Sequence, residues 1–125
     1  MRTFASQILD LVKGKQVFEK LLVDGVCLLD EFENEINEKK QYVSELRTIF
    51  SYMDFFSNGA TLPKTKFREI KGDNIKVKRY EFKSNHLRIY AFNIPGSKMV
   101  VLGGYKNNQD ADIRRFNSIV KEYIG

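Results

Sequence analysis

Cations and phenols gather in one stretch of this 125-residue chain, from Lys64 to Lys106. The stretch holds eleven Lys and Arg residues against three carboxylates, so its net charge is +8. Arginine forms bidentate hydrogen bonds with phosphate, and lysine acts as a point charge or, when its pKa is lowered, as a base. A field of this sign attracts polyanions, of which nucleic acid is the commonest in a cytoplasm. The residue types predict a surface that binds nucleic acid, and the alternative is a surface that keeps the protein in solution.

Each of these side chains also has an ordinary structural explanation. Arg88 lies in an alternating strand and fits a face exposed to solvent, while Lys76, Lys78 and Lys83 fit the protection of an edge strand against aggregation. His86 flanks a turn, where an exposed histidine needs no function. The aromatic residues suited to stacking on unpaired bases fit the core equally well, and they are Tyr80, Tyr90, Phe92 and Tyr105. Taken one at a time, none of these residues indicates a site.

Several kinds of chemistry have no motif in the sequence. Gly103-Gly104 is not followed by Lys-Ser/Thr and a helix at the spacing of a phosphate-binding loop, and no serine or cysteine nucleophile motif is present. The chain has one cysteine, Cys27, and one histidine, which argues against a zinc site of the usual kind. We therefore expect no metal and no cofactor, and we interpret Cys27 as a small core residue.

The composition predicts one domain spanning residues 1–125. Apolar residues make up 42% of the chain and charged residues 30%, which are ordinary values for a globular protein. No apolar run approaches the roughly 20 residues that a membrane-spanning helix needs, and the N-terminus does not resemble a signal peptide. A lone cysteine is compatible with a reducing compartment. We therefore expect a cytoplasmic protein without a membrane partner.

The first half of the chain, residues 1–62, is acidic and is predicted to be mainly helical. Residues 4–13 have apolar side chains at helical spacing, with a strand as the alternative, and residues 16–23 favour a strand. From residue 29 to 57 the apolar residues recur every three or four positions, which predicts one bent helix or a helical hairpin broken in the polar segment 37–41. We expect the carboxylates of this half to form a solvated face.

The second half predicts a basic antiparallel sheet over residues 63–107. Turn signals separate three expected strands at residues 75–82, 87–93 and 98–104. A last helix over residues 109–124, capped by Asp110 or Asp112, closes the chain. The expected fold class is α+β: an antiparallel meander of three to four strands, with a helical hairpin or long helix and a C-terminal helix packed on it.

The order of these parts resembles the RelE/HigB toxins of the RelE/ParE superfamily, which belong to bacterial type II toxin–antitoxin systems. The resemblance spans roughly residues 16–124. Glu81-Phe82-Lys83 stands where the family has Glu-Leu-Arg, and Arg88-Ile89-Tyr90 matches its second strand. The run from Val101 to Lys106 matches the third strand, although Asn107 replaces the second of two lysines that follow it in the family. The resemblance implies a single RelE-like domain.

The resemblance also implies a function and roles for particular residues. RelE-like toxins are metal-independent endoribonucleases (mRNA interferases) that cut mRNA on the ribosome and are neutralised by a cognate antitoxin protein. Their chemistry makes the 2′-hydroxyl attack the adjacent phosphate, which needs a base, an acid and cations. By resemblance, the catalytic candidates are Arg88, Lys106, Lys83, Tyr105 and His86. The RNA-binding candidates are Lys66, Arg68, Lys71, Lys76, Lys78 and Arg79.

An alternative function remains open, because related toxins with the same scaffold act on gyrase and cut no RNA. The chain would then be a non-enzymatic basic α+β module that binds RNA or a protein target such as gyrase. Lysine at position 83 lacks the bidentate fork of arginine, and the chain has no obvious histidine–carboxylate pair. The departures that leave the activity open are Lys83 and Asn107, which removes a cation.

Overall fold

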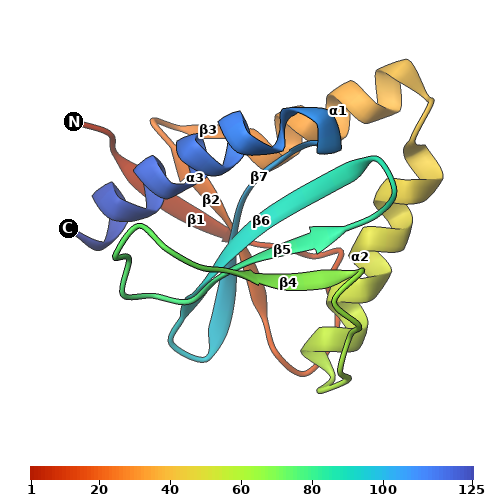
Figure 1. Ribbon diagram of the computed structural model, residues 1–125, viewed down its shortest axis with the longest axis horizontal. Coiled ribbons are helices and arrows are strands. Elements are labelled where there is room, and N and C mark those ends of the chain that lie inside the picture. The colour runs from red at the N-terminus through yellow and green to blue at the C-terminus, as the bar shows by residue number, and fades with distance from the viewer.

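One mixed sheet with helices on both faces organises the protein in a computed structural model that describes all 125 residues (Figure 1). The strands are β1 (Phe4–Ile8), β2 (Phe18–Val23), β3 (Val26–Cys27), β4 (Phe67–Ile70), β5 (Arg79–Lys83), β6 (Leu87–Ile94) and β7 (Ser97–Tyr105). The helices are α1 (Leu28–Lys39), α2 (Val43–Ser57) and α3 (Gln109–Ile124), and a 3-10 turn, η1 (Lys106–Asn108), precedes α3. The predicted α+β class with a C-terminal helix is confirmed.

The sheet is larger than the predicted meander of three to four antiparallel strands. Its order is β1-β2-β7-β6-β5-β4, with the short β3 paired to β2. β4 to β7 form an antiparallel meander, but β2 runs parallel to β7. Parallel neighbours need a long connection. Here the connection contains the helical hairpin and four further strands, so the parallel pair could not be read from adjacent segments of the sequence.

The N-terminal segment is a strand, so the helix predicted over residues 4–13 is wrong and the strand alternative is confirmed. Phe4 pairs with Val23 and Ile8 with Glu19 in an antiparallel ladder. The helical spacing was misleading because Ile8 and Leu11 are exposed and do not share a buried stripe with Phe4. The strand predicted over residues 16–23 is confirmed as β2. Residues 1–62 therefore contain three strands beside the two helices.

The long apolar stripe forms a helical hairpin rather than one bent helix. α1 ends in the polar segment where the break was predicted, and Lys40 adopts the left-handed conformation that ends many helices. Its backbone N–H donates to the carbonyl of Ile36. The buried stripes of the two helices pack on one face of the sheet, which we call the hairpin face.

The first strand of the predicted meander begins later than expected, and one strand was missed. Residues 71–78 form a loop in which Asp73 and Asn74 have positive φ, so the strand predicted from residue 75 begins only at Arg79. The missed strand is β4, whose four residues pair with β5. The other two predicted strands agree with β6 and β7 to within a residue at each end.

The helix α3 covers the second face of the sheet, which we call the α3 face. Phe116, Ile119 and Val120 are buried there against β6 and β7. Neither Asp110 nor Asp112 caps this helix, since the N-cap is Asn108 and it makes no side-chain capping bond. None of the three helices has the length and apolar character needed to cross a membrane.

A close approach of α1 to β7 gives the first testable prediction. A β-carbon added at Gly103 would lie 2.4 Å from Cδ2 of Phe32, closer than carbon atoms can approach. We expect Gly103→Ala to lower the free energy of unfolding by about 1–3 kcal/mol, measured by urea denaturation. Phe32→Leu in the same chain should recover part of this loss relative to the single Phe32→Leu variant. Unchanged stability of Gly103→Ala would show that the helix does not pack this closely.

Candidate functional site

Strand register brings the catalytic candidates to one end of the sheet. Lys83 pairs with Arg88, and Arg88 pairs on its other side with Gly104, so three adjacent strands contribute neighbouring positions. The backbone N–H of Lys106 donates to the carbonyl of His86 at 2.8 Å. Side-chain alternation then divides the candidates between the two faces. Lys83 and Arg88 lie on the α3 face, while Tyr105 lies on the hairpin face.

A buried carboxylate lies at the centre of the cations on the α3 face. Glu81 on β5 is fully buried and accepts a hydrogen bond from Nε of Arg68 on β4 at 2.8 Å. Nε2 of Gln109, at the start of α3, donates to both of its oxygens at 2.9 and 3.1 Å. Glu81 therefore connects two strands and a helix. A buried carboxylate without such partners would be strongly destabilising.

Lys83 lies beside this carboxylate and among the other cations. Burial lowers the pKa of Lys83, Glu81 raises it, and the positive charges of Arg68, Arg88 and Lys106 lower it further, with a net decrease. Lys83 pairs with Arg88 across the sheet, and Arg68 contacts the neighbouring Glu81, so these cations lie near one another. A lysine with a lowered pKa supplies more of the neutral amine near neutral pH.

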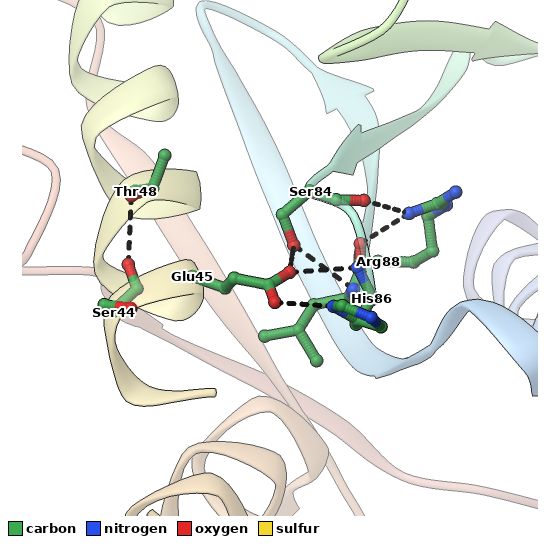
Figure 2. A network of polar contacts seen from close by, with 7 residues as sticks. Ser44, Glu45, Thr48, Ser84, His86 and Arg88 are labelled. Atoms are coloured by element: carbon green, nitrogen blue, oxygen red, sulfur yellow. Dashed lines mark hydrogen bonds and ion pairs between the residues drawn. The ribbon is translucent and has the colours of Figure 1, made fainter. Parts of the chain in front are cut away.

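Arg88 is buried, so its interpretation as part of a solvent face is wrong. The residue is 7% exposed because α3 covers its face of the sheet. Nη1 donates to the carbonyls of Ser84 and Leu87 at 2.6 and 2.8 Å, whereas the buried Nε has no partner (Figure 2). The turn between β5 and β6 thus orients the guanidinium and leaves donors unused.

A histidine–carboxylate pair lies at the same turn, contrary to the expectation that the chain has none. Glu45 reaches from α2 and accepts hydrogen bonds from the Ser84 hydroxyl at 2.6 Å and the His86 backbone N–H at 2.9 Å (Figure 2). Its other oxygen lies 2.7 Å from Nδ1 of His86. The imidazole also stacks on Tyr42, with ring centroids 4.7 Å apart. These contacts engage Nδ1 and leave Nε2 of a half-exposed ring available to a substrate.

The pKa of Glu45 reflects these contacts. Burial raises it, but the hydrogen bonds from Ser84 and His86 and the charge of His86 outweigh burial, so the net pKa is lowered. Glu45 therefore carries its charge near neutral pH and orients the imidazole. Sequence reasoning missed it because it precedes His86 by 41 residues and was assigned to a solvated face.

Tyr105 is held by the other helix of the hairpin. Its hydroxyl donates to the carboxylate of Glu35 on α1, and its ring packs edge-on against Phe32. Burial and the bond to Glu35 raise the pKa of Tyr105 to about 12, so the phenol keeps its proton near neutral pH. Together with Glu45, Glu35 shows that the acidic hairpin is not only a solvated face.

The six RNA-binding candidates do not share one surface. Arg79 is buried and donates to Oδ1 of Asn117 at 2.5 Å and to the carbonyl of Gly72 at 2.6 Å, so its guanidinium is engaged within the protein and its role as an RNA contact stays a prediction. Arg68 is paired with Glu81, and Nζ of Lys66 lies 5.0 Å from the ring centroid of Tyr52. The three exposed lysines lie at or within the loop after β4, and they are Lys71, Lys76 and Lys78.

The base-stacking candidates are mostly core residues. Tyr80, Tyr90 and Phe92 are buried, so the structural explanation holds for all three. Tyr105 is partly exposed and remains accessible at the end of β7. No group of three or more His, Cys, Asp or Glu side chains is placed to hold a metal ion.

Lys98 is a buried cation to which sequence reasoning gave no role. It is 4% exposed, and Nζ lies 4.3 Å from the ring centroid of Tyr80 and 4.8 Å from that of Phe56. Nζ has one hydrogen-bond partner, Oδ1 of Asn93 at 2.6 Å. Burial, with a smaller contribution from Lys78, lowers the pKa of Lys98 to about 8. A signal was present, because alternation in β7 places Lys98 on the same face as Val100.

The chain matches no protein-family model, no curated protein and no solved structure. Its function therefore has to be argued from the arrangement of its own residues.

The Glu45 network predicts how stability depends on pH. Because folding lowers the pKa of Glu45, its stabilising effect is present above its ordinary value of 4.5 and is lost as the pH falls through the folded value. We expect Glu45→Gln to cost about 0.5–1.5 kcal/mol at pH 7 and much less at pH 3. Urea denaturation at both pH values measures this, with Glu38→Gln on the exposed side of α1 as the control. An equal loss at both pH values would contradict a role for the charge.

The burial of Lys98 predicts a pH dependence of opposite sign. Between about pH 8 and pH 10.5 the unfolded chain holds the proton that folded Lys98 has lost, so folding becomes more favourable as the pH rises. Over this range, wild type should gain about 1–3 kcal/mol relative to Lys98→Met, which has a similar volume and no charge. Parallel denaturation curves for the two proteins measure the difference. If the difference in free energy of unfolding between the two proteins does not change with pH, the amine is in contact with water.

Proposed function

We propose that this protein is the toxin of a toxin–antitoxin pair and cleaves mRNA as a metal-independent endoribonuclease with a RelE-like fold. The observation that carries the proposal is the gathering of Lys83, Arg88 and Lys106 at one end of the sheet, beside a histidine oriented by a carboxylate. Cations and an acid–base pair are the two components that RNA transesterification requires.

The order of the elements supports the proposal further. A helical hairpin precedes a basic meander, and an amphipathic helix closes the chain, in the order that the resemblance to RelE-like toxins implies. The matched segments fall on β5, β6 and β7, and their ends meet. The resemblance therefore involves residues that are close in space as well as in sequence.

The proposed reaction is an internal transesterification. A base removes the proton of a 2′-hydroxyl, the oxygen attacks the adjacent phosphorus, and the bond to the 5′-oxygen breaks as an acid protonates the leaving oxygen. The products are a 2′,3′-cyclic phosphate and a 5′-hydroxyl end. Negative charge grows on the phosphate oxygens in the transition state, so fixed cations accelerate the step.

The geometry suggests a division of labour. Arg88 is held by two carbonyls through Nη1, and its Nη2, which has no partner in the protein, would face the phosphate, with Lys83 and Lys106 as further positive charges. Nε2 of His86 serves as the base or the acid, since Nδ1 faces Glu45. The phenol of Tyr105 stays protonated, and we assign it to a hydrogen bond near the leaving group, for which it would exchange its bond to Glu35. Lys71, Lys76 and Lys78 are exposed and available to the RNA backbone.

The proposal also names partners and a location. The substrate is mRNA, which we expect the protein to cut on the ribosome, and the inhibitor is a cognate antitoxin protein. Both would be met in the cytoplasm. Charge steers association with RNA, and the +8 of the Lys64–Lys106 stretch supplies a field of the right sign.

Induced expression and a cell-free translation reaction together test the activity. We expect growth arrest on induction and cleavage of translated mRNA by the purified protein, with cyclic phosphate and 5′-hydroxyl ends. The end groups distinguish this reaction from metal-assisted hydrolysis, which leaves a phosphate on one end without a cyclic product. Removing metal is not informative here, because ribosomes need Mg²⁺.

Variants connect the activity to the site. Arg88→Ala should lower the cleavage rate about 10²–10³-fold and His86→Ala about 10²–10⁴-fold, and Lys106→Ala should also relieve growth arrest. Lys13→Ala is the matched control, because Lys13 is exposed and its backbone bonds Asp54 near the far end of α2 from Glu45. Unchanged growth and intact mRNA would overturn the proposal. Binding of RNA without cleavage would instead identify a non-enzymatic module.

A further inference from the structure

An open sheet edge and an apolar groove lie together on the side of the molecule that β4 borders. β4 is the last strand of the sheet, and no other strand pairs with its outer edge (Figure 1). A groove of about 880 Å³ runs along it, between β4 and the segment that leads from α2 to β4. The groove contains none of the five catalytic candidates, although Arg68 and Lys71, which line it, are also RNA-binding candidates.

The backbone of β4 has unused hydrogen-bonding groups on this edge. Lys83 N–H donates to the carbonyl of Lys66, so the hydrogen-bonded positions of the β4–β5 ladder are 66, 68 and 70. Alternation in an antiparallel ladder then turns the N–H and C=O of Glu69 and the C=O of Phe67 outward. The N–H of Phe67 already donates to the carbonyl of Pro63. An extended peptide would find one donor and two acceptors in strand geometry.

The groove supplies an apolar floor for side chains of such a peptide. Phe56, Leu62 and Phe67 line it, and the rings of Phe56 and Phe67 lie 4.7 Å apart by their centroids. Both rings are only partly buried by the rest of the chain. Alternate side chains of an added strand point to the same face, so every second residue would reach this floor.

The charges around the groove select the partner. Lys64, Arg68 and Lys71 line it against one carboxylate, Glu69, which Lys71 pairs with at 3.3 Å. Lys64 makes no ion pair or hydrogen bond within the protein, and the side chain of Arg68 is 46% exposed despite its bond to Glu81. Positive charge beside an apolar floor fits acidic residues that alternate with apolar ones, whereas RNA offers no aliphatic side chains.

We propose that the β4 edge binds an extended, acidic segment of a partner protein, which adds to the sheet as an eighth strand. Main-chain hydrogen bonds to Glu69 and Phe67 would hold the peptide in register, and the apolar floor and the cations would select its side chains. The groove shares Lys71 with the proposed RNA-backbone contacts but holds no catalytic candidate, so peptide binding and RNA cleavage can each fail without the other.

A matched pair of variants at Glu69 tests the backbone part of the proposal. Glu69→Pro removes the outward N–H without removing a bond of the β4–β5 ladder, and proline is tolerated on an edge strand. Glu69→Ala removes the same carboxylate but keeps the N–H. The probe is a fluorescent eight-residue peptide in which leucine alternates with glutamate. We expect Glu69→Ala to bind it at least as well as wild type and Glu69→Pro to bind at least about tenfold more weakly by anisotropy.

Two further measurements keep the test decisive if Glu69→Pro fails to fold. The same peptide with N-methyl groups on alternate residues should bind wild type at least about tenfold more weakly, because one of its edges then lacks donors. A peptide with lysine in place of glutamate should also bind more weakly, and raising the salt concentration should remove that difference.

Three outcomes would overturn the proposal. They are equal binding of the peptide by Glu69→Pro and Glu69→Ala when both are folded, amide NMR shifts that map away from β4, and binding of an eight-nucleotide RNA at this edge in place of the peptide. The last outcome would make the groove part of a nucleic-acid surface.

Discussion

The buried carboxylate of Glu81 is the interaction on which the arrangement of this end of the molecule depends. A charge removed from water has to be compensated, and here Arg68 and Gln109 provide the compensation from β4 and from the first turn of α3. The pairing fixes where α3 begins relative to the sheet. It also places a negative charge among Lys83, Arg88 and other cations that would otherwise repel one another. The site and the helix packing are therefore parts of one electrostatic arrangement.

Sequence patterns predicted the elements better than they predicted their surroundings. The helical stripe, the polar break at residues 37–41 and the turns before β6 and β7 all depend on local chemistry, and they were placed correctly. β1 and β4 were missed or misassigned because they are short, polar edge strands whose existence depends on pairing with β2 and β5. The parallel pairing of β2 with β7 has no local signal, since the chain between them is long.

The charged residues of the strands also show that a local pattern does not predict what surrounds an element. An alternating strand with charges on one side predicts a solvent face, but α3 covers that face and buries Arg79, Glu81 and Arg88. Each of these side chains then needs a partner from a distant segment, as Arg79 finds in Asn117. Because both faces of the sheet are covered by helices, the charged residues of the strands form an internal polar layer instead of an exposed one. Only the cations near the end of the sheet remain candidates for contact with a substrate.

The two halves of the chain complement one another at this end. The N-terminal half is acidic and the C-terminal half is basic. Composition alone does not explain what this difference does in the structure. In the structure Glu35 and Glu45 extend from the helical hairpin to Tyr105 and His86 at the ends of the strands. The carboxylates lower the conformational freedom of these side chains, keep the phenol protonated and leave one nitrogen of the imidazole free. The acidic residues of this scaffold therefore orient a phenol and an imidazole near an arginine that has an unpaired donor, and that is a narrower property than a basic surface.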